Sequence, residues 1–303
     1  MNNRGVVADR ISQLPEALIL QILCLLPTKI AITTSVLSKK WQSHWKKMPK
    51  LKFDSFLHRL DLENVCKSLL SHKAPVLHNF RLKVRLDGRN NAVDIGILIG
   101  IAMTRNVRKL VLEVYFHRGS FAFSRSLYNC ETLETLKLIL NVVMDVPSSV
   151  SLKSLRTLHL LAVDFKDDDS VINFLSGCPN LQDLVNITDV SEIIDEKLLV
   201  FLTSVKRLSL ALTPTVFKFP TGIIFNQLVY LELYTNKKSW WKLLPLMLHS
   251  SPKLQVLKLI NNLDGMNFVE ASGEWNQPKN VPECLLFHLE TCGKATNGNE
   301  KRR

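Results

Sequence analysis

Two hydrophobic periods divide the chain. From Ser12 to Pro27 the apolar residues follow the 3.6-residue period of a helix, which Ser12 can cap and Pro27 should end. At about 100° per residue these apolar positions span roughly 180° of the helix, whereas packing on one core needs a stripe of only about 100°. The excess indicates either a second face that contacts something else or a helix buried in a larger core.

Two further short helices are expected, over residues 29–34 and 38–47. Trp41 and Trp45 lie four residues apart, which places them on one face of an α-helix. A unit of about 45 residues is smaller than most domains that fold without a staple, a metal or a partner. The N-terminal segment therefore favours partner binding.

The second period is a repeated LxxLxL frame that tolerates Val or Phe. It starts at Leu77, Val107, Leu133, Leu155, Leu181, Val205, Leu228 and Leu254. Spacings of 22 to 30 residues fall within or beside the leucine-rich repeat range of about 20 to 29 residues. Each frame predicts a short strand, and helical stretches are expected before Leu181 and Leu254. An ordinary α/β sheet protein is the alternative.

Composition limits the class of protein. The chain has 303 residues, 46% hydrophobic and 22% charged, as in an ordinary globular protein. It contains no apolar run of the roughly 18 residues that a membrane helix needs, and its first residues lack the apolar core of a secretory signal. The six cysteines form no CxxC pair, which favours reduced thiols in the cytoplasm or nucleus and argues against a zinc site.

The net charge of +12 is unevenly distributed. Residues 1–52 carry +7, residues 164–196 carry −8 and residues 203–260 carry +7. Nucleic-acid binding would be better supported by one continuous basic surface with stacking aromatics. We therefore rank a nucleic-acid binder low.

The sequence assigns no catalytic residue, no metal ligand and no cofactor. The motifs GxSxG, GxGxxG, GxxxxGK[ST] and HExxH are absent. The run Asp167-Asp168-Asp169 lacks the glycine and the distal glutamate of a calcium loop, so we interpret it as a solvated turn.

The N-terminal segment carries a series of short motifs in a fixed order: Asp9-Arg10-Ile11-Ser12, Leu14-Pro15, Ile22-Leu23, Leu26-Pro27-Thr28-Lys29, Ala31, Thr34-Ser35-Val36-Leu37-Ser38 and Trp41. In this order and spacing the segment resembles an F-box of the form common in plant F-box and leucine-rich repeat proteins. Ile30 stands where the family usually has Asp, and Lys40 where Arg is common. The resemblance implies docking onto the Skp-type adaptor of a cullin–RING ubiquitin ligase. The adaptor-binding residues expected are Leu14, Pro15, Ile22, Leu26 and Pro27.

The resemblance extends over nearly the whole chain. The repeats are similar to those of the same plant family, and residues 275–290 are similar to the opening of its FBD domain. The expected fold is α/β: a three-helix F-box (1–52), an irregular leucine-rich repeat solenoid forming a curved arc (53–274), and a truncated FBD-like segment with a disordered tail (275–303).

The resemblance implies a non-catalytic substrate-recognition subunit of an SCF-type E3 ubiquitin ligase, with an unknown protein target. A non-degradative adaptor-binding scaffold is the first alternative, and a basic nucleic-acid-binding repeat protein is a weaker one.

Period-2 alternation places one row of strand residues opposite the core leucines. This expected target surface includes Lys137, Thr157, His159, Asp183, Arg207, Tyr230, Glu232, Tyr234 and Lys258. Tyr230 and Tyr234 are the best anchors, since tyrosine is enriched at interface hot spots. A merely solvated face is the alternative.

The last repeat needs a cap, because the terminal unit of a stack otherwise exposes its apolar face. Trp275, Val281, Leu285, Leu286, Phe287 and Leu289 could cover the repeat at Leu254. The residues after Thr291 have little apolar content. We therefore expect order to end near Leu289.

Overall fold

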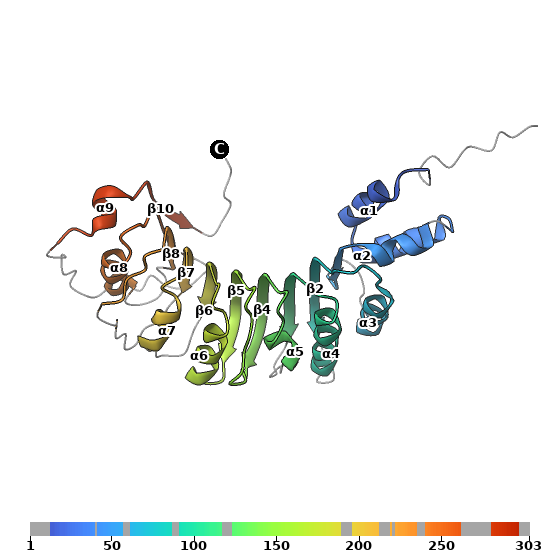
Figure 1. Ribbon diagram of the computed structural model, residues 1–303, viewed down its shortest axis with the longest axis horizontal. Coiled ribbons are helices and arrows are strands. Elements are labelled where there is room, and N and C mark those ends of the chain that lie inside the picture. The colour runs from blue at the N-terminus through green and yellow to red at the C-terminus, as the bar shows by residue number, and fades with distance from the viewer. Residues whose placement is uncertain are drawn as a thin grey trace, which may run out of the picture. The chain divides into compact units, whose positions relative to one another are not determined.

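The computed structural model describes residues 13–39, 41–56, 61–86, 91–116, 123–188, 196–211, 219, 222–234, 240–261 and 280–296. The chain divides into two compact units, Met1–Tyr115 and Phe116–Arg303. In both units helices alternate with strands (Figure 1), and the strand pairs whose register is resolved run parallel. The expected mixture of helices with parallel strands is confirmed.

Short helical elements begin the first unit. These are α1 (Glu16–Leu25), α2 (Thr28–Thr33) and the 3-10 segments η1 (Thr34–Val36) and η2 (Trp41–Lys47). Pro27 separates α1 from α2, as predicted. Pro15, and not Ser12, is the N-cap of α1; its ψ of 143° is extended, so the helix starts at Glu16. Ser12 itself lies outside the described residues.

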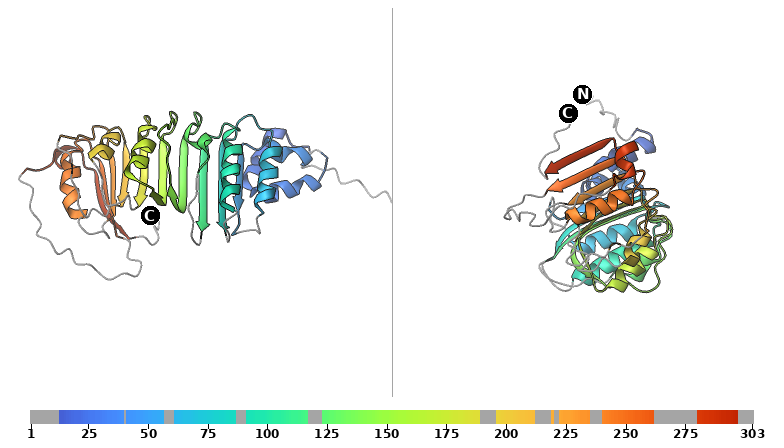
Figure 2. Two further views of the ribbon diagram at one scale, coloured as in Figure 1. Left: turned by 90° about the horizontal axis from the view of Figure 1, so that it is seen from below. Right: turned by 90° about the vertical axis from the view of Figure 1, so that its left-hand side faces the viewer.

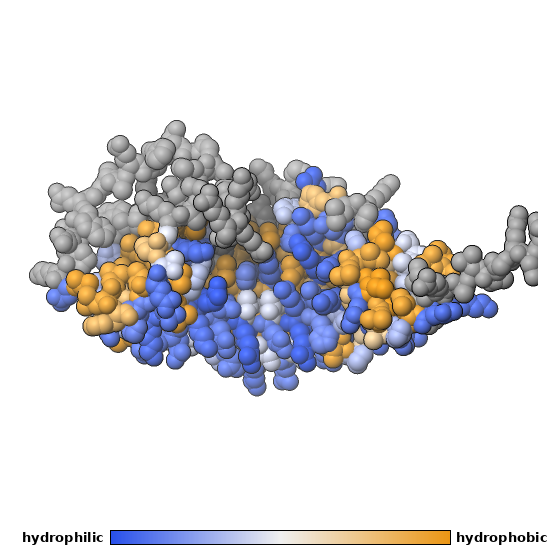
Figure 3. Space-filling model, turned by 90° about the horizontal axis from the view of Figure 1, so that it is seen from above, coloured by the Kyte–Doolittle hydropathy of each residue, from blue (hydrophilic) through white to orange (hydrophobic). Residues whose placement is uncertain are grey.

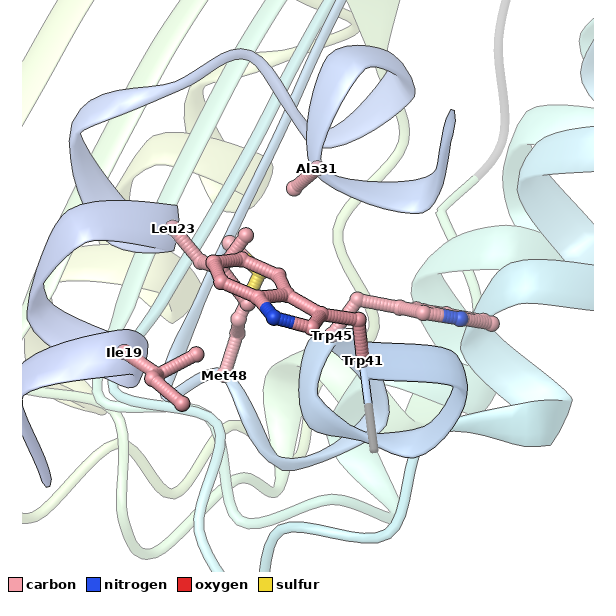
Figure 4. Packing of buried hydrophobic residues seen from close by; sticks show 6 residues of the cluster. All are labelled: Ile19, Leu23, Ala31, Trp41, Trp45 and Met48. Atoms are coloured by element: carbon pink, nitrogen blue, oxygen red, sulfur yellow. The ribbon is translucent and has the colours of Figure 1, made fainter. Parts of the chain in front are cut away.

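A buried cluster holds these helices together. Ile19 and Leu23 of α1 pack with Ala31, Trp41, Trp45 and Met48 (Figure 4). The prediction that Trp41 and Trp45 share one helix face is wrong. A 3-10 helix has three residues per turn, so positions four apart diverge, and the two indole rings point to opposite sides in Figure 4.

The first unit continues into strands. β1 (Lys50–Asp54), β2 (Asn79–Leu86) and β3 (Lys109–Phe116) follow one another across the sheet, and α3 (Leu62–Ser71) and α4 (Asn91–Met103) lie between them in sequence. β1 pairs with β2 in parallel, with Leu51 opposite Phe80 and Lys52 opposite Arg81. Leu51 and Phe80 are buried while Lys52 and Arg81 are exposed, so one sheet face packs inward and the other faces solvent.

The second unit continues the same pattern, with its strands paired in chain order. Its strands are β4 (Thr135–Met144), β5 (Thr157–Phe165), β6 (Asp183–Thr188), β7 (Arg207–Ala211), β8 (Tyr230–Tyr234), β9 (Val256–Asn261) and β10 (Thr291–Thr296). Its helices are α5 (Arg125–Tyr128), α6 (Asp168–Ser176), α7 (Glu196–Phe201), α8 (Trp240–His249) and α9 (Glu283–Phe287). The helices that alternate with the strands within each unit, such as α4 in the first and α6 and α8 in the second, lie along one face of those strands (Figure 2).

The repeated frame fixes the strands. Every predicted frame residue, from Leu77 to Leu254, is buried, and each of β2 to β9 begins two residues after it. The helices expected before Leu181 and Leu254 are α6 and α8. The acidic run is not a solvated turn: the Asp167 side chain accepts hydrogen bonds from Ser170, which lower the pKa of its carboxyl and cap α6.

The frame also has two members that the sequence pattern missed. β1 begins two residues after Met48, and β10 begins two residues after Leu289. Met48 is buried like the frame leucines, but methionine was not among the accepted residues. Cys292 and Lys294 replace the later leucines of the last frame, which hid its period.

The C-terminal prediction requires correction. Order does not end near Leu289, because β10 pairs in parallel with β9 from Thr291 to Thr296. Backbone hydrogen bonds stabilise this strand where apolar content is low: the Glu290 and Thr291 amides both donate to the Gln255 carbonyl. Residues 297–303 and Trp275 lie outside the described residues.

The apolar cap residues were also misassigned. Val281, Leu285, Leu286 and Phe287 are exposed. The segment is instead held by Cys284, whose buried thiol donates to the Leu248 carbonyl at 3.3 Å. A five-residue helix has one inward position per turn, and Cys284 occupies it.

The N-terminal helices terminate the sheet at β1. No strand precedes β1 among the described strands, so an edge of its backbone needs another partner. The buried Thr28 hydroxyl of α2 accepts a hydrogen bond of 2.6 Å from the Lys52 amide. At the end of α3, the buried His72 ring hydrogen-bonds through Nε2 to the Met48 carbonyl at 2.7 Å.

Thr28→Val tests the edge contact. The substitution keeps the shape but leaves the β1 amide without its acceptor, and an unsatisfied buried donor costs about 1–3 kcal/mol. We expect the free energy of unfolding, measured by chemical denaturation, to fall by that amount. The control is Thr33→Val, whose hydroxyl is exposed; its effect should stay within about 0.5 kcal/mol. Equal effects of both variants would contradict the edge role of Thr28.

His72 should make stability depend on pH. Burial lowers the pKa of His72 below its ordinary value of 6.5, so the unfolded chain binds a proton more readily than the folded chain. The stability that neutral His72 allows is therefore present above about pH 6.5 and is lost as the pH falls below it. Thermal unfolding should show a smaller acid loss in His72→Gln than in wild type. His78→Gln, an exposed control, should retain the wild-type pH dependence; an unchanged dependence in His72→Gln would refute the assignment.

Candidate functional site

Helix α1 has two apolar faces. Ile19 and Leu23 are fully buried in the cluster, whereas Leu18, Ile22 and Leu25 are 44%, 41% and 84% exposed. Positions i, i+4 and i+7 lie on one side of a helix. Leu18, Ile22 and Leu25, called here the α1 outer face, therefore form an apolar stripe turned to solvent, which resolves the wide stripe of the sequence into a packed face and an open one.

More exposed apolar residues follow in the same module. Ile30 of α2, Val36 of η1 and Leu37 after it are all exposed. Hydrophobic side chains gather over this end of the chain in Figure 3. Single exposed apolar residues are ordinary, but a group of them on one small module is typical of a protein-binding surface.

The five residues expected to bind the adaptor divide into two groups. Ile22 and Pro15 are exposed, whereas Leu14, Leu26 and Pro27 are half-buried. Leu14 and Leu26 pack against the module's own cluster, and Pro27 is the N-cap of α2. Sequence reasoning missed Leu18 and Leu25 as surface residues, although their positions on the helical wheel were the available signal.

The expected target residues share the solvent side of the second unit's strands. Strand register places Thr157, Asp183, Arg207 and Tyr230 in one row across β5 to β8. The next row includes Lys137, His159, Glu232 and Lys258. Tyr234 lies further along β8. The residues are exposed or half-buried and alternate with buried leucines, so their placement on one face is as predicted.

Tyr230 is the centre of a polar network on that face. The Arg207 guanidinium lies 4.7 Å from its ring centroid and the Lys258 ammonium 5.7 Å. Its hydroxyl donates to Glu232 at 2.8 Å, and Glu232 also accepts from the Ser209 hydroxyl at 3.0 Å. The two cations over the Tyr230 ring and the two hydrogen bonds accepted by Glu232 hold these side chains in fixed positions. This order lowers the entropy cost of binding a partner.

The first unit has a comparable network that sequence reasoning missed. Lys83 and Arg85 of β2 lie 4.9 Å and 5.0 Å from the Phe56 ring centroid, and Tyr115 packs edge-on at 5.4 Å. Glu113 of β3 is buried and accepts from Arg81 at 2.6 Å. The alternation Arg81, Lys83, Arg85 in a strand frame was the available signal.

A cavity of about 610 Å³ lies between α2, η2, β1 and α3. Ile32, Trp45, Phe53 and Val65 line it, with a polar rim. Rim groups are already paired: Asn64 donates to Asp61 at 3.1 Å, and Lys67 binds Glu63 at 2.7 Å. The cavity is thus apolar without a convergent set of polar groups to orient a cofactor.

The described residues also bear on metal and membrane binding. Within the described ranges, no three or more His, Cys, Asp or Glu side chains are grouped so as to hold a metal ion. None of the helices among those residues has the length and apolarity to cross a bilayer. Among the described residues, the surfaces identified above are an apolar helix face and polar, aromatic sheet faces.

Comparison with known proteins matches two segments of the chain to family models. A model of the F-box domain matches residues 11–53, and a Leucine Rich Repeat model matches residues 154–179. A putative FBD-associated F-box protein of Arabidopsis thaliana is 69% identical over 96% of this chain and 85% of its own length. A putative F-box/FBD/LRR-repeat protein of the same plant is 48% identical over 95% of this chain and 83% of its own length. A third relative, an F-box/FBD/LRR-repeat protein of that plant, is 44% identical over 93% of this chain and 78% of its own length.

Proposed function

Since this chain belongs to the plant F-box/FBD/LRR-repeat family, we propose that it is the substrate-recognition subunit of an SCF-type cullin–RING ubiquitin ligase. The F-box binds a Skp-type adaptor, and the repeats bind a target protein. The observation that carries the proposal is the α1 outer face, an exposed apolar stripe on the F-box helix.

The proposed organisation keeps the three parts inferred from the sequence: a three-helix F-box (1–52), a leucine-rich repeat solenoid curved into an arc (53–274) and an FBD-like segment (275–303). The subunit works in the cytoplasm or the nucleus. It needs no cofactor and does no covalent chemistry. Its contribution is proximity, since a bound target experiences a high effective concentration of the conjugating enzyme carried elsewhere in the complex.

The proposed adaptor contact combines the predicted and the exposed residues. Ile22 and Pro15 contact the adaptor directly, joined by Leu18 and Leu25. Leu14, Leu26 and Pro27 contribute with their open sides while they hold the helix on its cluster. Burying this stripe supplies affinity at about 25 cal/mol per Å² of apolar area.

The proposed target contact is the network around Tyr230. Tyr230 and Tyr234 are the anchors; Arg207, Glu232 and Lys258 surround them, and Lys137, His159 and Asp183 extend the same face. Aromatic and arginine side chains dominate the binding energy of most interfaces. Alternating cations and carboxylates on such a face select the orientation of a partner.

The adaptor contact is tested with Ile22→Asp and Leu25→Asp. Both side chains are exposed, so the fold should persist while a charge enters the apolar interface. We expect at least about a tenfold loss of affinity for a purified Skp-type adaptor, measured by calorimetry. Gln42→Asp adds the same charge at an exposed polar site on η2, outside the α1 outer face, and should bind nearly as wild type. Wild-type affinity in Ile22→Asp and Leu25→Asp would refute this surface.

The target face is tested with Tyr230→Ala/Tyr234→Ala. Proteins are captured on the tagged chain with the proteasome blocked. The double variant should fail to capture a specific set of proteins that the wild-type chain captures. Tyr230→Phe removes the hydroxyl with its hydrogen bond to Glu232 but keeps the ring, and it should retain most of that set. If the double alanine variant captures the same proteins as wild type, this face is a solvated surface and not the target contact.

Reconstitution separates a degradative receptor from a scaffold. The complex of adaptor, cullin and RING subunits with this chain should transfer ubiquitin to a captured protein. Adaptor binding without any transfer to the captured protein would favour the scaffold.

A further inference from the structure

The solvent face of β1 to β3 is strongly basic. Alternation with the buried residues of these strands places six cations on it, Lys50, Lys52, Arg81, Lys83, Arg85 and Lys109, against two carboxylates, Asp54 and Glu113. Five of these six cations are exposed, and Lys83 is half-buried. This face belongs to the same compact unit as the F-box helices.

Both carboxylates of the face are already engaged. Glu113 is buried and binds Arg81 at 2.6 Å and Lys83 at 3.7 Å. Asp54 accepts from the Phe56 amide at 2.8 Å. Within the part of the chain that the structure describes, Arg85 has no carboxylate partner. The charge of Arg85, and that of Lys52 beside Arg81, is therefore open to an anionic ligand.

Aromatic packing fixes the open guanidinium. Arg85 lies over the Phe56 ring at 5.0 Å, and Tyr115 packs edge-on against that ring. An arginine in cation–π contact with a ring keeps its N–H donors for a carboxylate, because the ring accepts no conventional hydrogen bond from them. The contact with Phe56 therefore presents a preorganised anion-binding group.

From this geometry we propose that the solvent face of β1 to β3 binds an acidic, Asp- or Glu-rich segment of the captured protein in extended conformation. Arg81, Lys83 and Arg85 are successive outward residues of one strand, spaced by about 6.6 Å. Alternate side chains of an extended peptide have the same spacing. The inference rests on the proposed function, in that the ligand is a segment of a target protein.

A nucleic acid fits this face less well. Non-specific binding of single strands needs open ring faces on which bases can stack. Here the Phe56 ring already has two cations within 5.0 Å and Tyr115 at 5.4 Å. The Phe56 ring positions Lys83 and Arg85, and positioned cations suit a ligand that carries carboxylates.

The test measures binding of a fluorescein-labelled oligo-glutamate peptide to the full chain, without adaptor, by fluorescence anisotropy. Arg85→Gln should weaken binding about tenfold, as the loss of one charge-assisted pair does. Phe56→Leu keeps every charge but removes the cation–π contacts, and it should also weaken binding. Lys67→Gln removes one exposed charge on α3 and is the matched control; it should bind as wild type.

Three outcomes would overturn the proposal: wild-type affinity in Arg85→Gln, an equal loss in Lys67→Gln, or tighter binding of oligothymidylate that Arg85→Gln abolishes. Thermal unfolding checks that Arg85→Gln, at an exposed site, folds normally. The same variant should capture the adaptor like wild type. If the wild-type chain binds oligo-glutamate but not the adaptor, the proposed function is rejected while the anion-binding role of this surface is retained.

Discussion

The structure depends on one constraint: a single strand of this chain cannot bury its own apolar face, so each repeat must pack against the next. The leucines at the frame positions are almost fully buried, and every strand starts at the same distance from them. Parallel pairing in chain order keeps equivalent residues in register from strand to strand. The same alternation that buries Leu208, Leu231 and Leu257 turns Arg207, Tyr230 and Lys258 to solvent. The composition of the solvent face is thus a direct consequence of core packing.

A stack of this kind has ends, and the ends determine where other parts of the chain attach. At β1 the F-box helices supply the missing partner through the hydroxyl of Thr28, while His72 fastens the end of α3 to the Met48 carbonyl. At the other end, β10 extends the pairing and Cys284 anchors α9 to α8. The F-box is therefore continuous with the first strands, and helix α1 packs inward through Ile19 and Leu23 while it offers a second apolar face to solvent.

The exposed surfaces differ in their chemistry, which suits partners of different kinds. The α1 outer face is apolar, and burial of apolar area gives affinity with little dependence on salt. The sheet faces combine rings with paired cations around Phe56 and Tyr230. Charged, preorganised groups of this type mainly set the orientation and the rate of association. In the function proposed for this member of the F-box/FBD/LRR-repeat family, the α1 outer face docks the adaptor and the outward residues of the sheet contact the target; core packing constrains only the inward residues.

The sequence alone determined the periodic features. Leucine spacing predicted β2 to β9, Pro27 predicted the end of α1, and period-2 alternation placed Tyr230 and Lys258 on one face, because each of these follows from local geometry. Tertiary structure decided what local geometry leaves open. It made η2 a 3-10 helix with its two tryptophans on opposite sides, divided the wide stripe of α1 into a buried and an exposed face, and brought Phe56, Arg85 and Tyr115 together from separate segments. It also added β10, whose strand is stabilised by backbone pairing with β9 and not by its side chains. Side-chain patterns carry no signal for such a strand, since its hydrogen bonds are made by groups that every residue has.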